Sequence, residues 1–420
     1  MSEICLLNDG FLPEIDGVVN VMTNYARVIT ALGQKVSVVT PEYPGADDSG
    51  LDYPVIRYKS IDIRKAVGYT MGNPFSLKLL NELKTRDISI IHSHCPVIST
   101  FVAREARSKL NAPFILTYHT RFDLDIANIV KLKMIKDTAV HALVDNISTC
   151  DELWTVSRSA GESLKRIGYQ GDYIVMENGV DMEKGRADET QRRAETWKYD
   201  LPNDVPLFLY VGRLMWYKGI RIILDALSGL KSQGMDFRMV FVGDGMDAEQ
   251  IKAYANQLRL DDKCFFTGAI RERQRIKAWY SCADLFLFPS TFDTNGLVVR
   301  EAAACALPSV LISGSAAAEG TASGRNCFHI EENAASLAVC LARIMQNRQL
   351  LGRVGENAQA DLYISWDDAV KKAMDRYQIV LDNYKSGFYT KKRKGFYERT
   401  FDMQKEIMEL FRKFKPQSQA

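Results

Sequence analysis

Two carboxylates bracket one predicted turn between a strand and a helix. The apolar run DLFLFPS at residues 284–290 predicts a buried strand and its end, and a helical pattern follows over about 296–305. Asp293 therefore falls in the loop, and Glu301 falls about two turns into the helix. Such a turn lies where open parallel sheets bind ligands, outside the carboxyl ends of their strands.

The start of this helix, near Asn295, Gly296 and Leu297, is suited to an anion. It offers unpaired backbone N–H groups and the positive end of the macrodipole, and Gly296 lets an anion approach closely. Asp293 can accept hydrogen bonds from hydroxyl groups on one side of a bound phosphate, and Glu301 from hydroxyl groups on the other. A ligand with phosphates in the middle and sugars at both ends is a nucleotide-sugar.

A second set of phosphate-binding residue types follows the predicted strand at 207–211, in the sequence GRLMWYKG. Gly212 permits a close turn. Arg213 supplies a planar fork of donors and Lys218 a point charge, and both suit phosphate oxygens.

Both segments resemble the retaining GT-B glycosyltransferases of family 4. Asp293 and Glu301 keep the spacing of the family signature E-x-x-x-x-x-x-x-E, and residues 212–219 are similar to its diphosphate clamp. Two departures stand out. Asp293 replaces the first Glu and is shorter by one methylene, and Ala306 stands where the family usually has Gly.

The resemblance gives roles to residues elsewhere. Gly17, in the loop after the predicted strand at 4–7, would approach the donor diphosphate, and Ile270 would contact the nucleotide base through its backbone. His119, in a Y-H-T sequence at a strand end, would contact the donor sugar, and His94 would line the same site. The expected catalytic residues are His119, Arg213, Lys218 and Asp293, and the expected donor-binding residues are Gly17, Gly212, Ile270, Asn295, Gly296, Leu297 and Glu301.

The resemblance implies hexose transfer with retention at the anomeric carbon, and it implies neither a cofactor nor a metal. The nucleotide-sugar is a substrate. The D-x-D of Asp123 and Asp125 is the metal motif of a different glycosyltransferase fold, and GT-B enzymes do not need it.

Short apolar runs alternate with amphipathic segments throughout, which predicts parallel sheets covered by helices. The expected fold is α/β of the GT-B type, with two Rossmann-like domains facing across a cleft and a C-terminal helix crossing back to the N-terminal domain. The expected division is 1–183 for the acceptor domain, 184–204 for a polar linker, 205–365 for the nucleotide-sugar domain, 366–385 for the crossing helix and 386–420 for a basic amphipathic tail.

Composition excludes several classes of protein. Lys and Arg exceed Asp and Glu by 54 − 52 = 2, so nucleic acid is not an expected partner. The eight cysteines are scattered without a C-x-x-C pair, which favours free thiols in a reducing cytoplasm. No stretch resembles a signal peptide. We therefore expect a cytoplasmic protein.

A membrane lipid is the leading acceptor, because the sequence resembles bacterial enzymes that glycosylate diacylglycerol or phosphatidylinositol. The same analogy favours UDP over GDP. Residues 385–420 carry ten Lys or Arg and four acids beside an apolar stripe of helical period, which suits peripheral binding to an anionic inner membrane face. Packing of this tail on the enzyme's own first domain or on a second subunit fits equally, and a soluble sugar, polysaccharide precursor or protein acceptor remains open.

Two other classes of function remain. The chain could be a non-catalytic GT-B subunit that binds a partner transferase, although a scaffold need not keep Arg213, Lys218 and Glu301 together. A nucleotide-dependent dehydrogenase or epimerase is disfavoured, because DGFLPEIDG follows the first strand in place of the dinucleotide fingerprint G-x-G-x-x-G.

Overall fold

The computed structural model describes all residues except 15, 63–69, 75, 120–132, 294 and 390–420. The chain divides into two units. The first comprises residues 1–177 and 369–420, and the second comprises residues 178–368. The expected linker at 184–204 instead lies within the second unit, where Glu189–Thr196 forms helix α8.

The first unit is built on a parallel sheet with strand order β3-β2-β1-β6-β7-β8-β9. Strands β1 and β7, near its centre, are buried along their whole length, as expected when helices cover both faces of a sheet. The strands of the unit are β1 (Glu3–Leu7), β2 (Lys35–Pro41), β3 (Val55–Tyr58), β4 (Ser60–Asp62), β5 (Thr70–Gly72), β6 (Ile88–Ser93), β7 (Phe114–Tyr118), β8 (Glu152–Thr155) and β9 (Ile174–Val175), of which β4 and β5 form a separate antiparallel pair.

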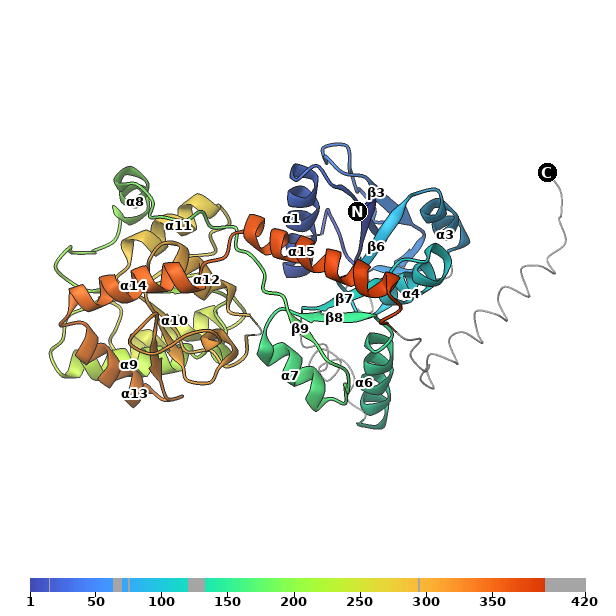
Figure 1. The fold of residues 1–420 in the computed structure, drawn as a ribbon. Coiled ribbons are helices and arrows are strands. Elements are labelled where there is room, and N and C mark those ends of the chain that lie inside the picture. The colour runs from blue at the N-terminus through green and yellow to red at the C-terminus, as the bar shows by residue number, and fades with distance from the viewer. Residues whose placement is uncertain (15, 63–69, 75, 120–132, 294, 390–420) are drawn as a thin grey trace. The chain divides into compact units, whose positions relative to one another are not determined.

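The helices of this unit are α1 (Gly17–Ala31), α3 (Leu77–Lys84), α4 (Ile98–Leu110), α6 (Lys133–Ile147), α7 (Arg158–Arg166) and most of α15 (Trp366–Lys385). Figure 1 shows α15 in red-orange and the sheet in blue to green. The last helix is fixed here by polar contacts. Arg376 donates to both oxygens of Glu152 on β8, at 2.8 and 2.5 Å, and the Tyr377 hydroxyl lies 2.6 Å from Nδ1 of His92.

The second unit has a six-stranded parallel sheet with order β12-β11-β10-β13-β14-β15. Numbered within the unit, this is 3-2-1-4-5-6, the order of Rossmann-type nucleotide-binding sheets. The strands are β10 (Leu207–Val211), β11 (Arg238–Val242), β12 (Cys264–Gly268), β13 (Leu285–Phe288), β14 (Ser309–Ile312) and β15 (Phe328–Ile330).

The remaining elements of the second unit are η1 (Trp216–Lys218), α9 (Ile220–Ser232), α10 (Ala248–Gln257), α11 (Arg273–Cys282), α12 (Leu297–Ala304), η2 (Ala316–Ala318), α13 (Ala334–Ile344) and α14 (Arg348–Leu362). The strand order reverses between β10 and β13, which pair side by side. Ligands of such sheets bind outside the carboxyl ends of the strands at this point. We therefore expect a ligand site at this switch point, between the loop after β10 and the loop after β13.

Candidate functional site

A glycine allows the two loops at the switch point, which follow β10 and β13, to lie in close contact. Gly219 has φ +78°, and a Cβ at this position would lie 1.8 Å from the carbonyl oxygen of Pro289. Only glycine allows η1 to approach the end of β13 so closely. The approach carries Lys218, at the end of η1, toward the loop that holds Asp293.

Lys218 and Asp293 form an ion pair. Nζ of Lys218 donates to Oδ1 of Asp293 at 2.7 Å, and the Ser290 hydroxyl donates to Oδ2 at 2.5 Å. The two side chains are 11% and 21% exposed. The rings of Tyr217 and Phe292, 4.7 Å apart between centroids, lie on the same ammonium group at 5.6 and 5.8 Å. The pair is thus partly shielded from water but open on one side.

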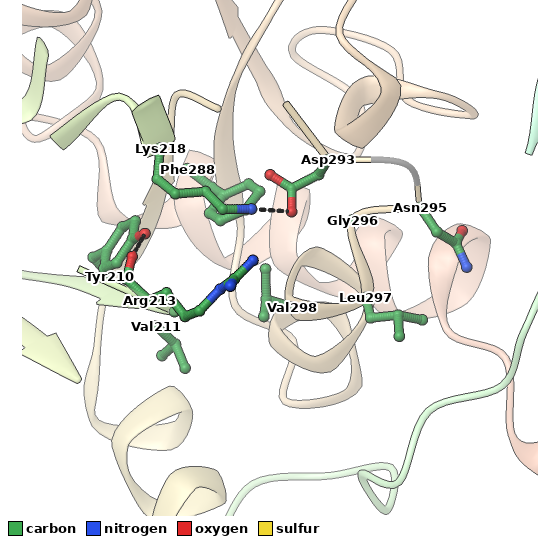
Figure 2. A pocket seen from close by; sticks show the side chains of 11 residues that line it. Tyr210, Val211, Arg213, Lys218, Phe288, Asp293, Asn295, Gly296, Leu297 and Val298 are labelled. Atoms are coloured by element: carbon green, nitrogen blue, oxygen red, sulfur yellow. Dashed lines mark hydrogen bonds and ion pairs between the residues drawn. The ribbon is translucent and has the colours of Figure 1, made fainter. Parts of the chain in front are cut away.

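Seven of the expected site residues line one cavity of about 210 Å³. Figure 2 shows Arg213 and Lys218 extending into the same space, while the Asn295 side chain points away from the Lys218 and Asp293 pair. Arg213 is exposed, and its guanidinium forms no ion pair with any residue that the structure describes. The expected residues in this lining are Gly212, Arg213, Lys218, Asp293, Asn295, Gly296 and Leu297.

The N-terminus of α12 opens on this cavity. Gly296 precedes the helix with φ +56°, and a Cβ there would lie 2.9 Å from Cα of Ala317, so a larger residue would be strained. No described side chain caps the helix. The N–H groups of Leu297 and Val298, which both line the cavity, therefore face the position where an anion would be stabilised.

The N-terminus of α1 differs. Asp16 caps this helix, and its Oδ1 accepts from the N–H groups of Val18 and Val19, both at 2.8 Å. Gly17 is the first helical residue, and a Cβ there would meet no atom within 4 Å. Of the two helix N-termini, α12 is the stronger candidate for binding phosphate, because the first N–H groups of α1 already have an acceptor.

Glu301 lies in the same unit but outside the lining of the cavity. It accepts from Nη1 of Arg273 at 2.9 Å and from the Tyr280 hydroxyl at 3.1 Å. Burial raises the pKa of this carboxyl group, and the Arg273 charge opposes the shift. Ile270, which follows β12, packs partly buried against the core of the unit and is also outside the lining. Arg273, Tyr280 and Ser290 were not expected from the sequence, because no spacing rule links them to the carboxylates.

His119 lies in the first unit within a cluster of buried imidazoles. It follows β7, His94 follows the neighbouring β6, and their rings meet with Nδ1 of His94 2.9 Å from Nε2 of His119. Burial lowers the pKa of His92 and His94 well below the usual value, and it lowers the pKa of His119 to about 3. His119 is therefore neutral near pH 7 and can exchange hydrogen bonds with a hydroxyl group without carrying charge.

Some expectations fall outside the described residues. They are the D-x-D of Asp123 and Asp125 and the basic tail from residue 390 onward. Within the described part of the chain, no group of three or more His, Cys, Asp or Glu is arranged to hold a metal. No helix there has the length and apolar character needed to cross a bilayer.

Two known family profiles match the chain. "Glycosyltransferase Family 4" matches residues 15–184, and "Glycosyl transferases group 1" matches residues 191–361. The alpha-monoglucosyldiacylglycerol synthase of Acholeplasma laidlawii is 23% identical over 367 residues, covering 85% of this chain and 91% of that enzyme. A GDP-mannose-dependent alpha-(1-6)-phosphatidylinositol dimannoside mannosyltransferase of Mycobacterium tuberculosis is 27% identical over 207 residues, covering 49% of this chain and 52% of that enzyme.

Solved structures resemble the fold over most of the chain. HepE of Anabaena in complex with UDP superposes with a TM-score of 0.72 at 17% identity, covering 90% of this chain and all of that one (100%). A glycosyltransferase of Rickettsia africae superposes with a TM-score of 0.70 at 19% identity, covering 91% and 100%. At these identities the similarity describes the fold.

Proposed function

The chain belongs to the family 4 glycosyltransferases and has their GT-B fold, and from this premise we propose that it transfers a hexose from a nucleotide diphospho-sugar to a membrane lipid. The transfer retains the configuration at the anomeric carbon. A UDP-sugar is the favoured donor and diacylglycerol the favoured acceptor.

The cavity at the β10 and β13 switch point is the main support for the proposed donor site. It gathers Arg213, Lys218 and the uncapped N-terminus of α12 around about 210 Å³ of space. As the glycosidic bond of the donor breaks, negative charge grows on the diphosphate. Two cations and a helix dipole in fixed positions stabilise that charge more than they stabilise the intact donor, which is the requirement for catalysis.

The two carboxylates, Asp293 and Glu301, accept hydrogen bonds from hydroxyl groups of the donor. Asp293, at the edge of the cavity, holds the transferred sugar together with the neutral imidazole of His119. Glu301 holds the ribose, and Ile270 meets the base through its backbone. Gly17 leaves open space beside the start of α1 for the diphosphate. We assign no metal and no protein base, and the departing phosphate takes the proton of the acceptor hydroxyl.

The acceptor proposal draws on the relatives. The Acholeplasma laidlawii relative is a monoglucosyldiacylglycerol synthase, and the Mycobacterium tuberculosis relative acts on a phosphatidylinositol dimannoside. A protein that uses such acceptors must work at a membrane surface, so we propose a cytoplasmic, peripheral location on the inner face of the membrane.

Deletion of residues 391–420 is expected to weaken binding of the protein to anionic vesicles. Unchanged binding would instead favour packing of that segment on the first domain or on a second subunit.

Two alternatives are distinguishable from this proposal. If the true acceptor is a soluble sugar or a polysaccharide, the protein would still bind the donor. It would fail only to transfer sugar to a lipid. A non-catalytic subunit would neither hydrolyse nor transfer from any donor. The ion pair between Lys218 and Asp293 argues against the second alternative, because a scaffold has no need for a lysine ammonium held in an open cavity.

The test is transfer of labelled glucose from UDP-glucose to diacylglycerol in vesicles that contain an anionic lipid. We expect a glucolipid whose anomeric proton has the small coupling constant of an α-linkage, formed in the presence of a chelator. Lys218→Met, which keeps the stem that packs under Tyr217 and Phe292, should abolish transfer in a folded protein. A β-linked product would refute retention, and full activity of Lys218→Met would refute the placement of the donor.

A further inference from the structure

The two chain connections between the units lie side by side where they enter and leave the second unit. This unit begins at Asn178 and ends at Asp368. Val180 forms a parallel bridge with Ser365, and its N–H donates to the carbonyl oxygen of Ile364 at 3.1 Å. A Cβ on Gly179 would lie 2.6 Å from the backbone of Trp366, so the two strands of chain are in close contact.

A side-chain contact joins the same two connections. Nε1 of Trp366 donates to Oδ1 of Asp181 at 2.6 Å. The other oxygen of Asp181 accepts from Nη2 of Arg273 at 3.4 Å. Asp181 therefore uses one oxygen for the connection that leaves the unit and the other for helix α11, which begins at Arg273.

Arg273 binds Glu301 with its other terminal nitrogen. Its Nη1 donates to Oε1 of Glu301 at 2.9 Å, while Oε2 of Glu301 accepts from Tyr280. The guanidinium is a planar, rigid fork, so its two nitrogens move together. A continuous polar chain thus runs from Trp366 through Asp181 and Arg273 to Glu301.

Because Glu301 is buried, the orientation of its carboxylate depends on the contact with Arg273. The Glu301 side chain is 10% exposed, whereas Arg273 is 48% exposed. A buried carboxylate without a partner is costly, so its orientation depends on the groups that satisfy it. A ligand hydroxyl that donates to Oε1 of Glu301 must share this oxygen with Nη1 of Arg273 or displace it. Movement of the guanidinium then changes the hydrogen bond from Nη2 to Asp181.

We propose that Arg273 is a positioning residue that presents Glu301 to the ribose of the bound nucleotide and transmits occupancy of that carboxylate to the contact between Asp181 and Trp366. This inference rests on the proposed function, which assigns the ribose to Glu301. It makes Trp366, at the paired connections, a reporter of donor binding.

The experiment is a UDP titration of protein labelled with ¹⁵N at its five tryptophan indoles, with the Trp366 resonance assigned from Trp366→Phe. GDP and ADP are titrated in parallel. In the wild-type protein, the Trp366 indole resonance is expected to shift with the same dissociation constant as that measured by calorimetry. In Arg273→Gln this response is lost, and UDP binds about ten-fold more weakly because Glu301 is left underpaired.

Arg275→Gln is the matched control. Arg275 lies on the same helix and is 49% exposed, close to the 48% of Arg273, but it pairs with Glu195. This variant should keep both the affinity and the Trp366 response. Arg273→Lys should recover affinity to within about three-fold, because an ammonium can pair with Glu301, yet lose the Trp366 response, because it lacks the fork that spans two carboxylates.

The outcomes separate this inference from the function on which it rests. If none of the three nucleotides binds the wild-type protein, the proposed function fails and the inference fails with it. If UDP binds and the Trp366 resonance does not move, or moves equally in Arg273→Gln, the donor site stands and the role of Arg273 is refuted. The unliganded spectra show whether each variant is folded.

Discussion

Replacement of Asp293 by Asn is expected to tighten nucleotide binding while it slows sugar transfer. In the unliganded protein the carboxylate holds the Lys218 ammonium at 2.7 Å and places a negative charge at the edge of the cavity where the diphosphate should bind. The substitution removes that charge and releases Lys218 for phosphate oxygens. The amide of Asn has the same size as the carboxylate of Asp, and its oxygen can still accept a hydrogen bond from the Ser290 hydroxyl.

The size of the effect follows from the geometry of the pair. Unit charges about 4 Å apart interact by about 4 kcal/mol at an effective dielectric constant of about 20. Because Lys218 and Asp293 are 11% and 21% exposed, solvent screening reduces the net effect. We therefore expect the free energy of UDP binding to become more favourable by about 1 kcal/mol, which corresponds to UDP binding about five-fold tighter. Loss of one contact to the sugar in the transition state should lower kcat by a factor on the order of 10².

The assay is calorimetric titration with UDP together with initial rates of glucolipid formation. Lys218→Met is the matched control, since it removes the other member of the same pair and should weaken UDP binding and abolish transfer. If Asp293→Asn weakens UDP binding as Lys218→Met does, the carboxylate helps to bind the nucleotide and does not compete with it. That result would refute the reasoning.

Three further predictions concern stability and the second carboxylate. Glu301→Gln should lower kcat/KM by a factor on the order of 10² in a protein that still unfolds cooperatively, as measured by initial rates and thermal unfolding. The three buried histidines have folded pKa values below 6.5, so the unfolded chain binds more protons as the pH falls. Stability present above pH 6.5 should therefore be lost below it, by about 1.4 kcal/mol per pH unit per histidine. In urea titrations between pH 7.5 and 5.5, His94→Asn should therefore lose about 1.4 kcal/mol less stability over this range than the wild type. Gly219→Ala should lower the free energy of unfolding by about 3 kcal/mol or more, because alanine would combine a left-handed backbone with a clash against Pro289, and equal urea midpoints would contradict the close approach.

The sequence predicted most of the strands because they are buried runs between polar turns. The predicted bounds 207–211 coincide with those of β10. Strands β3 and β15 were not predicted, because they are short edge or near-edge strands with little apolar contrast. The segment 184–204 is polar, which indicated a linker, yet it packs through pairs such as Glu195 with Arg275.

The candidate site was predictable in its parts but not in its contacts. The glycines, cations and carboxylates stand in recognisable positions along the chain. The bond between Lys218 and Asp293, however, joins residues 75 positions apart and depends on the approach that Gly219 allows. The fork of Arg273 is likewise a tertiary contact, since it connects Asp181 with Glu301 across 92 and 28 positions. Helical and strand periodicity carries no information about such pairs.

We expect the cavity at the β10 and β13 switch point to bind the diphosphate of a nucleotide-sugar. Thermal unfolding of the purified protein with UDP, GDP or ADP, without added metal, tests it most directly. One nucleotide, which we expect to be UDP, should stabilise the wild-type protein by about 2.7 kcal/mol at 100 times its dissociation constant, and Lys218→Met should lose most of this protection. No protection by any of the three nucleotides, or equal protection of Lys218→Met, would contradict the claim.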